Sequence, residues 1–310
     1  MIGGTLVTQG GTDMTHGPVI IEAAINGGTT KEQNPNVPRT PEEISADALA
    51  TIEAGAAIIH NHVDKIGRGP VLAAEEYWAG WAPVFEKRPD ALIYPTIEMD
   101  NGKLTFGHLP LLAEKNRVRV GLCDPGSVNL GKMGERGPMG AFVYGNSFDF
   151  IGEAFDLHTE HRLGPSLAIY EPGFLRATLE YQRVGRLPRG AMAKLYFSTD
   201  RGLTGAPFGL PPTVAALEAY LELLEGSGLP WAVSAAGGDV VATDMARVAL
   251  ERGGHLHLGL EFYGGDRQPT NVELVEEAVA LCESVGRAVA TPDEAAEILD
   301  LPRRDHVSTD

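Results

Sequence analysis

The sequence has few cysteines and no long apolar run. Its only two cysteines, Cys123 and Cys282, lie far apart in 310 residues, which excludes a disulfide framework and a C-x-x-C metal or redox motif. No apolar stretch reaches the length of a membrane span, and Met1 is not followed by the basic and apolar segments of a signal peptide. We therefore expect a cytoplasmic protein.

Basic residues are also scarce. The chain has 25 Lys and Arg against 42 Asp and Glu, which gives a formal net charge of −17. Neither nucleic acid nor an anionic membrane surface is an expected partner of such a chain. The acidic residues are spread along the sequence, as is typical of a solvated exterior.

What the chain has is a repeated alternation of short apolar runs and amphipathic segments. Such alternation indicates right-handed βαβ units and a parallel sheet. Eight of these units in this length predict an α/β fold, the (β/α)8 TIM barrel, as a single domain. The expected strands are residues 18–24, 56–63, 91–95, 119–123, 166–170, 193–197, 231–234 and 256–260.

No linker divides the chain, so we expect the catalytic barrel at 18–302, with an N-terminal arm at 1–17 and a C-terminal tail at 303–310. The non-repetitive stretch 131–164 is interpreted as a segment inserted after strand four, as a short pair of helices near the active face. A core position is expected for His255. The histidines expected on the surface are His16, His108, His158 and His161.

The apolar run 56–63 ends in two histidines, His60 and His62. Successive side chains of a strand point to opposite faces, so both histidines share one face while Asn61 turns away. This spacing allows both rings to bind one divalent metal if a third ligand comes from elsewhere. Taken alone, the pair favours the other interpretation, polar residues that close a strand and bind backbone groups.

The eighth strand offers the third ligand. Alternation with leucines places His257 and Glu261 on its interior face. Active sites of this fold lie at the carboxyl ends of the strands, and strands one, two and eight are neighbours in a closed barrel. Glu22, His60, His62 and Glu261 should therefore converge. Two histidines and a carboxylate predict an open site for one Zn²⁺ per chain; the alternative is a hydrogen-bonded polar plug.

Other polar residues follow the strands. Thr96, Ser127 and Glu171 come after strands three, four and five, and Asn26 lies in the glycine-rich loop after strand one. We interpret Asn26, Thr96 and Ser127 as candidate substrate-binding residues, and His257 as a candidate donor to the substrate. Each of the loop residues could equally be an ordinary loop cap.

Several long motifs resemble those of the β-keto acid cleavage enzymes, collinear with that family over residues 18–302. The resemblance implies a zinc TIM barrel that condenses a β-keto acid with acetyl-CoA, giving acetoacetate and a new acyl-CoA. The motifs are AAINGGTT at 23–30, NPNVPRTPEE at 34–43, AGAAIIHNH at 54–62, GGHLHLGLE at 253–261, TNVELVE at 270–276 and GRAVATPDEA at 286–295.

The resemblance also assigns roles. It implies that His60, His62 and Glu261 are the metal ligands, and it matches Ser127 and Glu171 to functional positions of the family. Glu171 is our first candidate for the catalytic base and Glu22 the second. His257 could assist the transfer of a proton.

The chain also departs from the family pattern. The family usually has arginine at the position of His257, aspartate at Phe262 and arginine at Gly238; it also has a serine at Pro95 and a glutamate where this chain has Gly28 and Thr29. These departures leave two rival functions open. One is a zinc-dependent aldolase or hydrolase that acts on a keto acid without CoA, and the other is a non-catalytic barrel that binds metal and ligand.

The departures also bear on the substrate. Loss of a fixed cation and a fixed anion at His257 and Phe262 favours a β-keto acid with an uncharged tail. Glu22 is the residue that could reverse this by holding an ammonium group. We also expect a homo-oligomer, a dimer or a tetramer.

Overall fold

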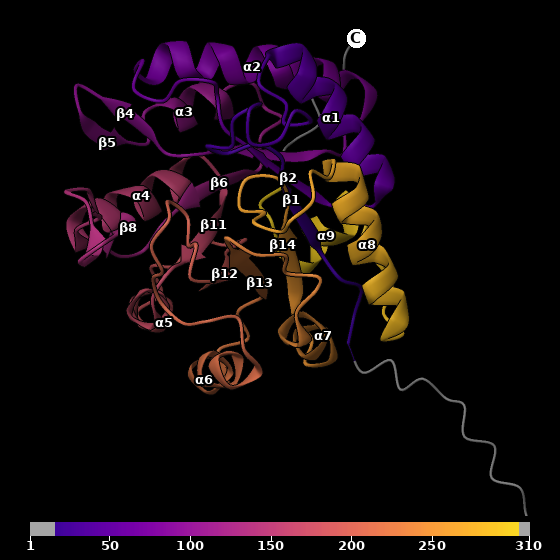
Figure 1. Ribbon diagram of the computed structural model, residues 1–310. Coiled ribbons are helices and arrows are strands. Elements are labelled where there is room, and N and C mark those ends of the chain that lie inside the picture. The colour runs from indigo at the N-terminus through magenta and orange to yellow at the C-terminus, as the bar shows by residue number, and fades with distance from the viewer. Residues whose placement is uncertain (1–15, 304–310) are drawn as a thin grey trace, which may run out of the picture.

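Eight parallel strands form the centre of the protein in the computed structural model, which describes residues 16–303 (Figure 1). The strands are β1 (Ile21–Ala24), β2 (Ile58–Asn61), β3 (Leu92–Pro95), β6 (Val120–Cys123), β11 (Gly164–Ile169), β12 (Met192–Ser198), β13 (Trp231–Ala236) and β14 (His255–Leu258). Their order in the sheet is β3-β2-β1-β14-β13-β12-β11-β6. Since β3 and β6 lie next to each other, the sheet is a nearly closed barrel, and the predicted fold is confirmed.

Nine helices of the described residues connect the strands and surround the barrel (Figure 1). They are α1 (Pro41–Ala54), α2 (Pro70–Lys87), α3 (His108–Ala113), α4 (Phe148–Glu160), α5 (Pro172–Arg183), α6 (Val214–Leu224), α7 (Asp244–Glu251), α8 (Asn271–Ser284) and α9 (Pro292–Ile298). None of them is long and apolar enough to cross a membrane. Most of the N-terminal arm and of the C-terminal tail expected from the sequence lies outside the described residues.

Helix ends follow the capping residues. Thr40 caps α1: its hydroxyl accepts from the backbone N–H of Glu43, and the Glu43 carboxylate accepts from the N–H of Thr40. Helix α7 begins at Asp244 because Thr243 is its N-cap and accepts from the N–H of Ala246 at 3.1 Å.

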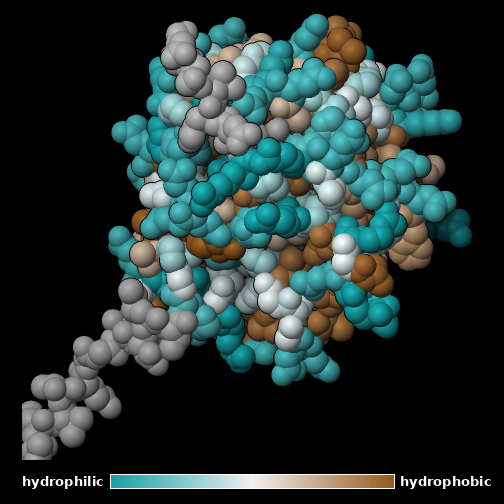
Figure 2. All heavy atoms as spheres, turned by 180° about the vertical axis from the view of Figure 1, so that it is seen from behind, coloured by the Kyte–Doolittle hydropathy of each residue, from teal (hydrophilic) through white to brown (hydrophobic). Residues whose placement is uncertain are grey.

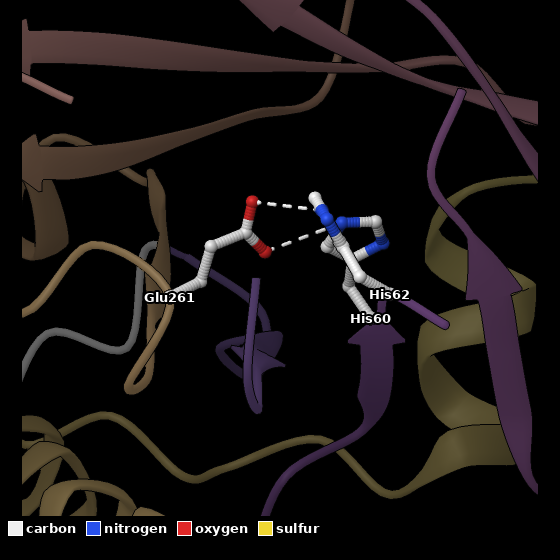
Figure 3. A group of neighbouring side chains, drawn as sticks. All are labelled: His60, His62 and Glu261. Atoms are coloured by element: carbon white, nitrogen blue, oxygen red, sulfur yellow. Dashed lines mark ion pairs between the residues drawn. The ribbon is translucent and has the colours of Figure 1, made fainter. Parts of the chain in front are cut away.

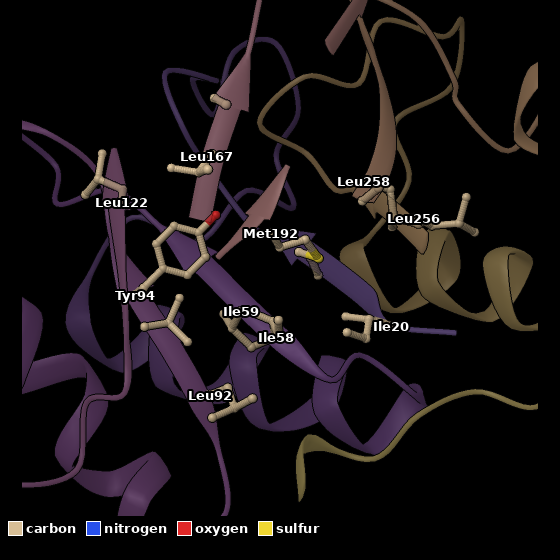
Figure 4. Close-up of a cluster of buried hydrophobic side chains, with 14 of the residues drawn as sticks. Ile20, Ile58, Ile59, Leu92, Tyr94, Leu122, Leu167, Met192, Leu256 and Leu258 are labelled. Atoms are coloured by element: carbon tan, nitrogen blue, oxygen red, sulfur yellow. The ribbon is translucent and has the colours of Figure 1, made fainter. Parts of the chain in front are cut away.

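The core lies between the barrel and its helices. All residues of β1, β2, β3, β6 and β14 are buried, so the short strands lose water on both faces. Figure 4 shows Ile58, Ile59 and Leu92 of two neighbouring strands in this core, together with the ring of Tyr94. Rigid packing on both faces fixes the strand ends, which is the requirement for a precise site at the barrel mouth.

The segment after β6 is inserted as predicted, but its structure differs from the expected pair of helices. It contains β7 (Val128–Asn129) paired with β10 (Val143–Tyr144), and β8 (Lys132–Gly134) paired with β9 (Gly137–Met139), before the single helix α4. Glycines at every third position from 131 to 140 disfavour a helix. A second hairpin, β4 (Glu98–Asp100) with β5 (Lys103–Thr105), follows β3.

The face of the molecule opposite to that of Figure 1 is mostly hydrophilic, with hydrophobic residues in separate small groups (Figure 2). Elsewhere on the surface, the inserted segment and the start of α4 expose several large apolar side chains. They are Met133, Met139, Phe142, Val143 and Phe148.

Two histidines expected on the surface are buried. His108 and His158 are 0% exposed, and a ring nitrogen of each donates to a backbone carbonyl, of Thr96 at 2.9 Å and of Ala154 at 2.7 Å. His158 lies on the inner face of the amphipathic helix α4, and His108 is the first residue of the short apolar helix α3; the sequence interpretation missed both. His255 is a core residue as expected, and its Nδ1 accepts from the N–H of Ile20 at 3.0 Å.

Candidate metal centre

Two histidine rings and one carboxylate meet at the mouth of the barrel (Figure 3). Nε2 of His60 lies 3.3 Å from Oε2 of Glu261, and Nε2 of His62 lies 3.1 Å from Oε1. One ligand atom from each residue can be chosen so that all three lie within 4.8 Å of one another. The structure thus brings together the three residues that the sequence predicted as ligands.

Because side chains alternate along β2, His60 and His62 lie on the same side of the strand end. Asn61, between them, points away from the barrel mouth, and its Oδ1 accepts from the indole N–H of Trp81 on α2 at 2.8 Å. The outward position of Asn61 is therefore satisfied by a buried partner, which fixes the rotation of the strand end.

Asn26 holds the backbone on which His62 lies. Its side-chain amide donates to the carbonyls of Pro38 and His62 at 3.1 and 3.0 Å, and its Oδ1 accepts from the N–H of Gly27 and His62 at 2.6 and 2.8 Å. All four hydrogen-bonding positions of this buried amide are used by backbone groups. In this structure the residue predicted to bind substrate positions a candidate metal ligand.

The position of Glu261 depends on two glycines, Gly259 and Gly27, each of which lies very close to a neighbouring part of the chain. The sequence pattern extended the last strand to Leu260, but β14 ends at Leu258 because Gly259 adopts φ +128°. A Cβ atom on Gly259 would lie 2.2 Å from the carbonyl oxygen of Ala24, and one on Gly27 (φ +52°) would lie 2.1 Å from Cγ of Glu261. Only glycine at both positions leaves room for the carboxylate.

His60 has further contacts on the side away from Glu261. Its Nδ1 lies 3.3 Å from the backbone carbonyl oxygen of Tyr94, and the Tyr94 ring stacks on the imidazole with centroids 4.5 Å apart. A proton on Nδ1 donated to this carbonyl leaves the lone pair of Nε2 directed into the site.

The electrostatics fit a cation. Burial holds the pKa of His60 well below its ordinary value, so its imidazole is neutral. Burial alone would raise the pKa of Glu261, but the contact with His62 lowers it to about 2, so the carboxylate is ionised. Among the described residues, Nε2 of His62 and Oε2 of Glu261 are buried without a hydrogen-bond partner. Ligand atoms that converge and lack a hydrogen-bond partner in the protein suit a divalent metal.

A second polar layer lies beneath these ligands. Along β1, Ala24 is opposite His60, while Glu22 is two residues deeper and opposite His257 of β14. Glu22 therefore lies below the end of β1 and is not level with His60, His62 and Glu261, with which the sequence analysis expected it to converge. Its Oε1 accepts from Nζ of Lys194 at 3.1 Å and from the hydroxyl of Tyr94.

Lys194 is a residue that the sequence interpretation missed. It lies in the middle of β12 and is 3% exposed. The signal was present in the sequence: a single lysine in an otherwise uncharged strand of a predicted barrel must be paired when it is buried.

Of the loop residues predicted after strands three, four and five, Ser127 and Glu171 bind backbone groups with their side chains. The hydroxyl of Ser127 accepts from the N–H of Asn146 at 2.9 Å and donates to the carbonyl of the same residue at 3.2 Å. The Glu171 carboxylate accepts from the N–H of Gly209 at 3.0 Å. Thr96 is 8% exposed, and its carbonyl accepts from His108.

Asp124 is a further acid that the sequence interpretation did not single out. It directly follows β6, and its carboxylate accepts from the hydroxyl of Tyr144 at 2.6 Å. Burial raises its pKa, and the positive charge of Lys194 acts in the opposite direction. Asp124 is therefore within electrostatic reach of the polar layer from the far side of the barrel.

Three positions that depart from the family pattern share one cavity. Gly238, His257 and Phe262 all line a space of about 20 Å³ next to β13 and β14. Most of its other lining residues are apolar, among them Ala235, Val240, Val241 and Leu258, while Ser234 and Asp239 are polar. The wall beside His257 is therefore largely apolar.

The fold and the site together define a (β/α)8-barrel enzyme with a His-His-Glu group at the carboxyl ends of its strands. The model of the β-keto acid cleavage enzyme family matches residues 18–301, and this chain belongs to that family.

Named relatives match over almost their whole length. The chain is 30% identical to a 3-keto-5-aminohexanoate cleavage enzyme of Fusobacterium nucleatum, covering 92% of this chain and 98% of the relative. It is 28% identical to a 3-oxoadipate:acetyl-CoA acetyltransferase of Cupriavidus necator (92% and 95%), and 25% identical to a 3-dehydrocarnitine:acetyl-CoA trimethylamine transferase of Rhizobium meliloti (92% and 97%). Among solved structures, the binary complex of ObcA with oxaloacetate has the same fold, with a TM-score of 0.67 and 18% identity over 87% of this chain and 68% of that chain.

Proposed function

We propose that this enzyme converts a β-keto acid and acetyl-CoA to acetoacetate and a new acyl-CoA. The observation that supports it most directly is the His60, His62 and Glu261 group at the barrel mouth of a chain in this family. The names of two relatives include acetyl-CoA as a reactant with a keto acid, which agrees with the proposal.

The metal of this site is proposed to be one Zn²⁺ per chain. Neutral imidazoles and an ionised carboxylate are the ligand set of open zinc sites. A bound zinc ion would polarise the ketone of a chelated β-keto acid and so ease cleavage between the α and β carbons. The protein residues keep the ligands in place and exclude water from the buried side of the site.

A proton must leave the α carbon of the keto acid and return to a product. Glu171, Glu22 and His257 are the proposed carriers, and the structure gives them different surroundings. Glu171 lies at the mouth, bound to the N–H of Gly209. Glu22 and His257 are fully buried, and Nε2 of His257 lies 3.3 Å from Oε1 of Glu22.

Rates of Glu171→Gln, Glu22→Gln and His257→Asn separate these candidates. Removal of the proton carrier should lower kcat by roughly 100-fold or more, while KM changes little. A uniform small effect in all three variants would remove them from this role. Asp124→Asn is then the next variant to measure. Thr96 and Ser127 remain proposed substrate contacts, and Asn26 could bind substrate only by releasing one of its backbone partners.

A panel of β-keto acids with acetyl-CoA tests the function. Mass spectrometry should detect acetoacetate and an acyl-CoA whose acyl group comes from the keto acid. Acetoacetate without new acyl-CoA, or products formed without any CoA, would support an aldolase or hydrolase instead. The apolar wall at Gly238, His257 and Phe262 is the observation that keeps this second candidate. Tight metal binding with no turnover would indicate a binding protein.

We also propose a cytoplasmic homo-oligomer, a dimer or tetramer. Light scattering should then return a mass of at least twice the 33.0 kDa of one chain. A single 33.0 kDa species across micromolar concentrations would contradict the proposal.

A further inference from the structure

A complete ion pair is buried directly beneath the candidate metal ligands. Nζ of Lys194 lies 3.1 Å from Oε1 of Glu22, and their side chains are 4% and 0% exposed. Lys194 is the only buried lysine in residues 16–303. Glu22 therefore does not present a free negative charge to the site.

The pair is connected to the candidate ligands through Tyr94. Nζ of Lys194 donates to the Tyr94 hydroxyl at 2.6 Å, this hydroxyl donates to Glu22, and Ser166 donates to it at 3.2 Å. The ring of the same tyrosine stacks on His60. Both charges of the pair thus lie one residue away from a candidate ligand.

Some polar atoms of this layer are not used by the protein. Oε2 of Glu22 and both ring nitrogens of His257 are buried without a hydrogen-bond partner among the described residues. The Lys194 ammonium has three N–H groups. Among the described residues, Glu22 and Tyr94 accept from two of them. The layer can therefore contact a ligand or water, but with a net charge of zero.

Fold stability alone does not explain such a pair. Burying two charges costs several kcal/mol per ion, and replacement by apolar residues is often neutral or stabilising. Interior layers of TIM barrels are usually filled by branched apolar side chains. A charge-balanced pair next to a metal site changes the electrostatic potential at that site when either partner is removed.

We propose that Lys194 and Glu22 form a specificity-determining ion pair, which makes the enzyme select a β-keto acid whose tail carries no charge. The inference rests on the proposed function. Lys194 neutralises the carboxylate that could otherwise hold an ammonium tail, and Glu22 neutralises the ammonium that could otherwise hold a carboxylate tail. The cavity wall at Gly238 and Phe262 is mostly apolar, and its one carboxylate, Asp239, is paired with Arg267 at 3.5 Å.

The test compares three β-keto acids of equal chain length, with an alkyl, an ammonium or a carboxylate tail, each with acetyl-CoA. In the wild type, kcat/KM should be highest for the alkyl substrate by roughly 10-fold or more. Lys194→Met should shift the preference toward the ammonium tail, and Glu22→Gln toward the carboxylate tail. The double variant Glu22→Gln/Lys194→Met should return to the alkyl preference.

Metal affinity gives a second readout that does not depend on turnover. With a competing chelator, Lys194→Met should bind Zn²⁺ more tightly than the wild type and Glu22→Gln more weakly, because each leaves one charge unbalanced. A purely structural role would weaken binding in both. Ser166→Ala changes the same layer without changing its charge. This variant should keep the substrate order of the wild type and its zinc affinity.

The outcomes separate the two proposals. No acyl-CoA product from any tail overturns the proposed function, while opposite shifts in zinc affinity would still support the charge balance. Turnover with a charged tail preferred by the wild type overturns the ion-pair proposal and leaves the function intact. If one single variant does not fold, the other single variant, compared with the wild type and the double variant, still decides.

Discussion

The two halves of the barrel differ in how their polar side chains are used. In the metal half, formed by β1, β2 and β14 with their loops, side chains at the strand ends converge on one point. In the insertion half, formed by β6, β11 and β12 with their loops, Ser127 and Glu171 bind backbone groups of the neighbouring loops. A polar residue after a strand therefore marks either a site or a loop anchor, and contacts across the barrel decide between them.

The largest effect is expected from the ligands of the metal half. His60→Ala and Glu261→Gln each remove one of three donors, so bound metal should fall from one per chain to a small fraction. Activity should fall by roughly 1000-fold or more. Metal analysis of freshly purified proteins checks the first claim, with Ser127→Ala of the insertion half as the control. Equal metal content in all these proteins and the wild type would contradict the site.

The glycines of the metal half offer a matched pair of variants. Gly27→Ala places a Cβ where the Glu261 side chain lies and requires φ +52°, whereas the region around Gly28 is open and its φ is not positive. Zinc affinity of Gly27→Ala should fall by about 10- to 100-fold, as for other residues that position a ligand.

Gly28→Ala should stay within about twofold of the wild type, since its Cβ meets no atom. Chelator competition measures both variants. Similar losses in the two would show that loop flexibility, rather than the space for Glu261, limits metal binding.

The metal half could be predicted because local rules determine it. Alternation places His60 and His62 on one face, and barrel closure makes strands one, two and eight neighbours. The order of the strands in the barrel was the only long-range contact that had to be known. Even the cap of α1 at Thr40 followed from adjacent residues.

The insertion half could not be predicted in the same way. Lys194 contacts a carboxylate 172 residues away, and this partner depends on the tilt of strands in the closed barrel. The roles of Ser127 and Asp124 depend on where the inserted hairpins turn back, at Asn146 and Tyr144. His158 was misplaced because a single polar residue on the inner face of a helix does not change the pattern of its outer face.

Asp47 links the stability of the metal half to pH. It lies on α1, where its Oδ1 accepts from Thr51 and from Asn271, the residue whose Oδ1 binds the N–H of Leu260. Burial raises the pKa of Asp47 to about 6. The folded state therefore binds this proton more tightly than the unfolded state, and stability is lost as the pH rises from about 4 to about 6.

The loss should amount to about 3 kcal/mol, from a pKa difference of roughly two units. Asp47→Asn keeps an acceptor for both hydrogen bonds and has no charge. Its unfolding free energy should match the wild type near pH 4 and exceed it near pH 7, as measured by urea unfolding. A constant difference between the two proteins across this range would show that Asp47 titrates as an ordinary aspartate.

The smallest effect is expected at Ser127, and it sharpens the contrast between the halves. Its hydroxyl both accepts from and donates to the backbone of Asn146, so Ser127→Ala leaves an N–H and a carbonyl of the inserted segment without this partner. The variant should lose about 1–2 kcal/mol of unfolding free energy, the usual cost of a buried group left unpaired. Ser127→Thr keeps the hydroxyl and should recover most of the lost unfolding free energy.

Zinc affinity should stay the same in both Ser127 variants, because no metal ligand is held by the contact of Ser127 with Asn146. A fall in zinc affinity larger than about twofold in Ser127→Ala, with recovery in Ser127→Thr, would show that the insertion half also positions the metal ligands.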